Sequence, residues 1–87
     1  MTNENVTVTP ANPRGGLCDN GYYEGCISVP KAAQDDTVTV TGVTEVIIIS
    51  AYIAEANNAW EETTISGNVI TLKSANTGTL IAQIMYK

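Results

Sequence analysis

Histidine and phenylalanine are absent from this 87-residue sequence, and charged residues make up only 15% of it. Histidine is the commonest general base, so its absence removes the usual means of proton transfer near neutral pH. None of the serines lies in a GxSxG motif, and no glycine-rich phosphate loop is present. We therefore expect a protein that is not an enzyme and that binds no cofactor.

Cations are also scarce, and the formal net charge is -5. The basic residues are Arg14, Lys31, Lys73 and Lys87. A nucleic-acid-binding protein needs clustered cations to displace the counterions of phosphate, and four scattered ones provide no such footprint. An anionic membrane surface would repel the chain for the same reason. We expect neither nucleic acid nor membrane as a partner.

Long apolar stretches are missing as well. The longest apolar run, residues 46–54 with Ser50 inside it, is too short to span a bilayer. Residues 1–20 contain neither a basic start nor an apolar h-region, so we expect no secretory signal and synthesis in a cytoplasm.

Cysteines and adjacent carboxylates offer little chemistry. Cys18 and Cys26 lie in LCDNGYYEGC, either as two reduced thiols or as a disulfide that closes this short loop. A zinc site would need a second ligand pair, so we expect no metal. The pairs Asp35–Asp36 and Glu61–Glu62 would point to opposite faces of a strand, which excludes a carboxylate dyad. We expect these four carboxylates to be solvated.

Val, Ile and Thr are abundant, and these residues fit a pleated strand better than a helix. Alternating or β-branched segments fill residues 37–87, and SGN at 66–68 and SANTG at 74–78 are typical of hairpin turns. Residues 1–36 contain all three prolines and four of the seven glycines. We predict an all-β fold: a small antiparallel β-sandwich or jelly-roll-like meander over 37–87, preceded by an extended arm with a Cys/Gly-rich loop over 1–36.

Two predicted strands are apolar on both faces. In EVIIISAYIA, Val46 and Ile48 point one way and Ile47 and Ile49 the other, and TLIAQIMYK repeats the pattern. About fifty residues provide too little chain to cover both faces. Either a partner covers the second face, or these strands are central and the arm folds over them. The candidate interface residues are Val6, Val8, Tyr22, Tyr23, Ile47, Ile49, Trp60, Ile81, Ile84 and Met85.

The segment from the threonine-rich TVTVTG strand to SGNVITLKSANTGTLIAQIMYK resembles small structural proteins of tailed-phage virions. It is similar to capsid decoration (cement) proteins and to β-sandwich modules of head and tail fibres. The resemblance covers residues 37–87 and rests on a turn-and-strand pattern. It implies a non-enzymatic virion protein, made in the host cytoplasm, that forms a homo-oligomer, with a trimer favoured. Its partner would be the major capsid protein or another virion protein.

A second interpretation fits the same fold. The chain could be a small fibre or receptor-binding module that presents Tyr22, Tyr23 and Trp60 to a host glycan or surface protein, because aromatic rings stack on sugars and provide large contact areas.

Overall fold

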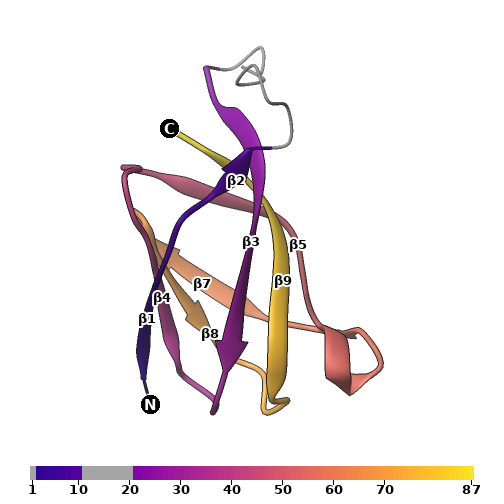
Figure 1. Ribbon diagram of the computed structural model, residues 1–87. Coiled ribbons are helices and arrows are strands. Elements are labelled where there is room, and N and C mark those ends of the chain that lie inside the picture. The colour runs from indigo at the N-terminus through magenta and orange to yellow at the C-terminus, as the bar shows by residue number, and fades with distance from the viewer. Residues whose placement is uncertain (1, 11–20) are drawn as a thin grey trace.

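Two β-sheets packed face to face form the computed structural model, which describes residues 2–10 and 21–87 (Figure 1). The four-stranded sheet has the order β1 (Asn3–Val6), β4 (Thr37–Val40), β8 (Val69–Leu72), β7 (Thr63–Ser66). The five-stranded sheet has the order β2 (Thr9–Pro10), β3 (Tyr23–Lys31), β9 (Gly78–Tyr86), β5 (Val46–Ile53), β6 (Ala59–Trp60). The predicted all-β sandwich is confirmed. Pairing is antiparallel except between β1 and β4, which are parallel.

The core lies between the sheets and follows the period of two that strands impose on their side chains. In β4, Val38 and Val40 are buried and the neighbouring threonines face outward. The same alternation supplies the rest of the core, which comprises Ile27, Val29, Val46, Ala51, Ile53, Ile70, Leu72, Leu80, Ala82 and Ile84. Ile84 is completely buried in this cluster, so its assignment to an interface is wrong.

A β-bulge in β5 explains the run of four aliphatics. Val46 and Ile48 face the core, and Ile47 faces outward. The register against β9 then shifts between Ile48 and Ser50, which inserts Ile49 as an extra residue on the outer side. Beyond the bulge, Ala51 resumes the inward face. The expected division of the isoleucines between two faces is therefore confirmed.

The described residues of the N-terminal part, 2–10 and 21–36, belong to the sandwich and do not form a separate arm. Strand β3 lies inside the five-stranded sheet, where it pairs with β9 over its whole length, from Tyr23–Tyr86 to Lys31–Gly78. Val6 and Val8 are partly buried and pack against the core, and their assignment to an interface with a partner stays a prediction. A domain boundary at residue 36 would cut through both sheets.

Two connections differ from the expected meander. The turn at 66–68 does join a hairpin, because Gly67 has a φ of 59° between β7 and β8. The segment at 74–78 instead carries the chain from β8 in one sheet to β9 in the other. Glu61 lies where the chain passes between the sheets in the other direction, from β6 in the five-stranded sheet to β7 in the four-stranded sheet. In the described part of the chain the helical content is the single 3-10 turn η1 (Ala54–Ala56), and no helix there could cross a membrane.

Candidate interaction surface

An apolar strip crosses the outer face of the five-stranded sheet. Ile47 and Ile49 of β5 and Trp60 of β6 are exposed by 37%, 46% and 64%. Ile81 and Met85 of β9 are half-buried on the same face, because their neighbours Leu80, Ala82 and Ile84 all point into the core. All five are among the interface residues that the sequence predicts, and the strand pairing places them on one surface.

Tyr52 belongs to the same strip, although its sequence context did not mark it. It is directly paired with Trp60 on one side and with Ile81 on the other. Since Ala51 and Ile53 are fully buried, Tyr52 faces outward. The bulge at Ile49 reverses the phase of the strand, so alternation counted from Val46 places Tyr52 on the wrong face.

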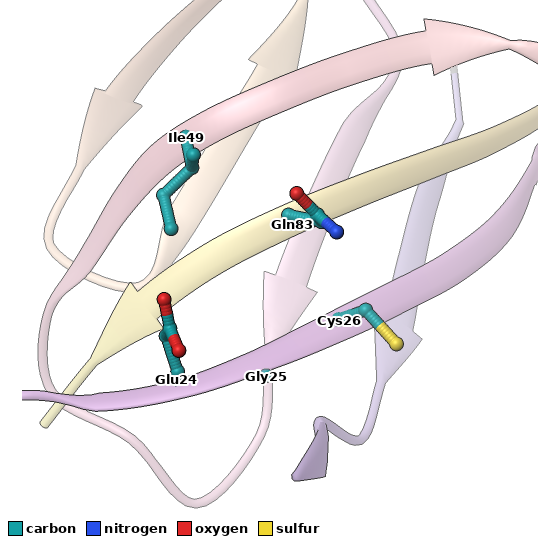
Figure 2. Close-up of a pocket in the computed structure, with 5 residues that line it drawn as sticks. All are labelled: Glu24, Gly25, Cys26, Ile49 and Gln83. Atoms are coloured by element: carbon teal, nitrogen blue, oxygen red, sulfur yellow. The ribbon is translucent and has the colours of Figure 1, made fainter. Parts of the chain in front are cut away.

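A hollow of about 170 Å3 lies beside this strip. Figure 2 shows the residues that line it on three neighbouring strands: Glu24, Gly25 and Cys26 on β3, Gln83 on β9, and Ile49 on β5. Gly25 is an inward position of β3, beneath Val8, so only its backbone borders the hollow. The hollow therefore combines an aliphatic side chain with the polar ends of a carboxylate and an amide.

The outer face of the four-stranded sheet has a different chemistry. Cross-strand pairing aligns two rows, Asn3–Thr37–Thr71–Thr64 and Asn5–Thr39–Val69–Ser66, in which every side chain except Val69 carries a hydroxyl or an amide. Several of these groups satisfy one another: the hydroxyls of Thr37 and Thr39 donate to Asn3 Oδ1 over 2.7 and 3.2 Å. This surface is uncharged and polar, so it already suits contact with water.

Tyr22 and Tyr23 lie apart from Trp60. Tyr23 is paired with Tyr86, and their rings stack with centroids 5.8 Å apart. Along the same strand, Ser28 occupies the row that contains Ile81, Tyr52 and Trp60. At about 3.3 Å per residue, Tyr23 is some 16 Å from that row. The three aromatics proposed for a glycan do not form one platform.

Tyr22 takes part in contacts at the C-terminal end of the chain. The Lys87 ammonium lies 4.6 Å from the centroid of its ring, a cation–π contact. A hydrogen bond with Glu45 raises the pKa of the Tyr22 hydroxyl, and desolvation adds to the shift. Lys87 also forms a 3.7 Å ion pair with Glu45. Tyr22 thus anchors the chain terminus to the segment before β5.

A fully buried ion pair crosses the sandwich, contrary to the expected solvation of Glu61. Lys31 Nζ lies 2.5 Å from Glu61 Oε1, and both side chains are inaccessible to solvent. Lys31 also donates to the carbonyl of Ser74, and the Ser74 N–H donates to Glu61 Oε2 over 2.8 Å. The pair therefore ties the end of β3 to the β6–β7 crossing and to the segment that follows β8.

Asp36 is buried too, so the expectation of a solvated carboxylate is wrong here as well. Burial by itself raises the pKa of its carboxyl, but hydrogen bonds from the N–H groups of Thr2, Ala33 and Ala32 outweigh it and lower the pKa to about 2. Asp35 is half exposed and pairs with Lys73. Asp36 thus fastens the start of β1 to the turn that precedes β4.

The structure describes only one of the two cysteines. Cys26 is exposed on the outer side of β3, at the rim of the hollow. Cys18 lies outside the described residues, so a Cys18–Cys26 disulfide stays a prediction. Among residues 2–10 and 21–87, no group of three or more His, Cys, Asp or Glu side chains is placed to hold a metal ion.

Comparison with known proteins adds no relative: no protein-family model matches the chain, and no curated protein or solved structure does so. The geometry described above is therefore the basis for a function. What it offers is a surface suited to binding another macromolecule, made of the apolar strip and the adjacent hollow.

Proposed function

We propose that this chain is a non-enzymatic structural protein of a tailed-phage virion, which decorates or cements the capsid through protein–protein contacts. The observation that carries the proposal is the apolar strip on the five-stranded sheet, where Ile47, Ile49 and Trp60 remain exposed. An exposed apolar sheet face next to a hollow is typical of a contact between proteins. The resemblance of residues 37–87 to phage structural proteins supports the virion as the place of that contact.

The edge of the four-stranded sheet is a second proposed point of contact with the major capsid protein. Strand β1 is the outermost strand of that sheet, and β4 occupies only one of its sides. An extended segment of a capsid protein would add to its open side, with backbone hydrogen bonds supplying the affinity. Pairing with β4 uses one edge of β1 and leaves its other edge open to a partner.

Antibody raised against the purified chain and labelled with gold tests this function on intact virions. Many labels distributed over the head support decoration. Labels confined to fibre tips, or virions without label, contradict it.

A wash of the virions in high salt is a second test of the same function. Apolar and backbone contacts resist salt, whereas exposed ion pairs are screened beyond about 8 Å at physiological ionic strength. Release of the protein by moderate NaCl would also contradict the proposal.

Binding of a host glycan is the second candidate function, because Trp60 is the most exposed large apolar side chain described. A sugar ring stacked on its indole would quench or shift its fluorescence at constant protein concentration. The separation of Trp60 from Tyr23 restricts such a site to the Trp60–Tyr52 pair. A glycan series that leaves the emission of Trp60 unchanged would remove this candidate.

A further inference from the structure

Strand β1 has one edge that pairs with β4 and one that pairs with no strand of the sheet (Figure 1). Towards β4, the Thr2 carbonyl accepts from the Thr37 N–H over 2.8 Å, and the Val6 carbonyl accepts from the residue that follows β4. Backbone groups of successive residues in a strand point alternately to its two edges. The N–H and carbonyl groups of Asn3 and Asn5 therefore point to the open edge, where an extended segment can pair with them.

The side chain of Glu4 lies beside this open edge, on the inner side of the sheet. Glu4 is in register with the buried Val38, and it is two residues from Val6, which packs against the core. It is half-buried. Within residues 2–10 and 21–87, its side chain has no hydrogen bond and no ion pair. An open row of backbone groups thus adjoins a half-buried carboxylate that lacks a counter-charge.

The described cations are already used elsewhere in the molecule. Each of them is paired with another carboxylate: Lys31 with Glu61, Lys73 with Asp35, and Lys87 with Glu45. The formal charge of the whole chain is -5, which attracts a cationic partner and repels an anionic one. A second molecule is therefore the natural source of a counter-charge for Glu4.

We infer that the open edge of β1 binds an extended segment that carries a lysine or arginine opposite Glu4 and an aliphatic residue, two positions away, opposite Val6. Side chains directly opposite each other on paired strands are neighbours, and opposite charges there stabilise the pairing. Backbone hydrogen bonds to Asn3 and Asn5 supply affinity, and the ion pair with Glu4 supplies selectivity. The inference rests on the proposed function for the source of the segment, which is the capsid protein.

Glu4 also discriminates against other occupants of the edge. A purely apolar strand would cover its carboxylate without providing a counter-charge, which costs free energy. Strand β1 of a second copy, paired about a two-fold axis, would bring two Glu4 side chains together along a short interface, and like charges on paired strands destabilise them. Charged side chains that point inward on edge strands are a known protection against unselective pairing. Here the same carboxylate admits a basic segment.

Synthetic peptides test this recognition with the isotope-labelled full-length protein in an NMR titration. The probe is Thr-Val-Thr-Lys-Thr-Val-Thr, which is symmetric about its lysine, so that parallel and antiparallel pairing present the same side chains. Its counterpart has glutamate in place of lysine. The lysine peptide should bind roughly tenfold more tightly than the glutamate peptide. It should also slow hydrogen exchange at the amides of Asn3 and Asn5, whereas those of Glu4 and Val6, which point to β4, should already exchange slowly in the free protein.

Variants separate the charge from the edge. Glu4→Gln should abolish the preference for the lysine peptide, and Glu4→Lys should reverse it in favour of the glutamate peptide. Glu62→Gln is the matched control, because it removes an exposed carboxylate just before β7, at the opposite edge of the sheet, and it should leave the preference unchanged. Asn5→Pro removes the outward N–H at a position where an edge strand tolerates proline, and it should weaken binding of the lysine peptide roughly tenfold. Circular dichroism shows that each variant is folded.

Several results would overturn the inference. They are equal binding of the two peptides, no binding of either, and a preference that persists in Glu4→Gln. Slower exchange at Asn3 and Asn5 when the protein is concentrated without peptide would also overturn it, because the occupant would then be a second copy. The peptide experiments use the isolated chain, so their failure leaves the capsid function to be judged by gold labelling. Selective peptide binding together with unlabelled virions would contradict the capsid function and leave the recognition of basic segments in place.

Discussion

Replacing one member of the Lys31–Glu61 pair should damage the protein more than replacing both. In Lys31→Met the carboxylate of Glu61 stays buried without its counter-charge and keeps only the Ser74 N–H as a partner. In Glu61→Leu the ammonium of Lys31 stays buried with only the Ser74 carbonyl. The double variant removes both charges, and what it leaves unsatisfied is the pair of backbone groups of Ser74.

The magnitudes follow from burial. Breaking one partner of a buried pair costs about 3–5 kcal/mol, whereas a lost neutral hydrogen bond costs about 1–3 kcal/mol. Ser74 is only partly buried, so water can replace some of its lost bonds. We therefore expect each single variant to lose about 3–5 kcal/mol of unfolding free energy and the double variant about 1–3 kcal/mol. For a chain of 87 residues the whole stability is on the order of 4–13 kcal/mol.

Urea denaturation followed by circular dichroism measures all four proteins of this double-mutant cycle. With a slope of about 1–3 kcal/mol per molar urea, the single variants should lower the midpoint by at least about 1 M. The double variant should recover part of that loss. A double variant whose loss equals the sum of the two single losses would mean that the two side chains do not interact, and the buried pair would be refuted.

Three further changes test the packing and the acid sensitivity of the fold. Gly25→Ala should lose about 1–3 kcal/mol, because the new Cβ would lie 2.5 Å from Val8 Cγ1 and 2.8 Å from the Thr9 carbonyl; an unchanged thermal midpoint would contradict this approach of β2 to β3. Ile84→Asp should prevent folding, because it places an unpaired carboxylate in the core; a soluble variant with the native circular dichroism spectrum would contradict its burial. The wild-type protein should lose about 1–2 kcal/mol of unfolding free energy as the pH falls from about 4 to 2, because the folded-state pKa of Asp36 is about 2 and its ordinary value is 3.8. Asp36→Asn should lack this part of the loss. Equal losses of unfolding free energy in the two proteins over this pH range would contradict the prediction.

The strands of residues 37–87 could be predicted because each combines alternation with a turn of recognisable composition. In β4 two buried valines alternate with threonines, so the inward face is evident from the sequence alone, and in β8 the buried Ile70 and Leu72 flank Thr71 in the same way. The apolar strip could be predicted as well, because the short chain has too few residues to cover the outward side chains of Ile47, Ile81 and Met85.

Strand β3 was missed because its inward positions do not look like core residues. They are Gly25, Ile27, Val29 and Lys31, and only the middle two are aliphatic. Glycine weakens a strand prediction, and a buried lysine is recognisable only through its partner. Alternation across ISVPK was the available indication, but Pro30 obscured it.

Contacts between residues far apart in the sequence could not be predicted for the site either. Glu61 could be placed beside Lys31 only after the order of strands in both sheets was known. The hollow likewise depends on the register that brings Glu24 and Cys26 next to Gln83. No local pattern encodes that register, because it is fixed by which residues of β3 and β9 reach the shared core.

The unlike outer faces of the two sheets determine how far assembly through this fold can grow. A sandwich with apolar residues on both outer faces would stack copy upon copy, and each addition would expose a fresh surface for the next. Here the second face carries the mutually hydrogen-bonded Asn3, Thr37 and Thr39, which water solvates as well as another protein would. A partner bound to the apolar strip would therefore leave the polar face outside, and the threonine rows would offer little apolar surface on which a further molecule could stack.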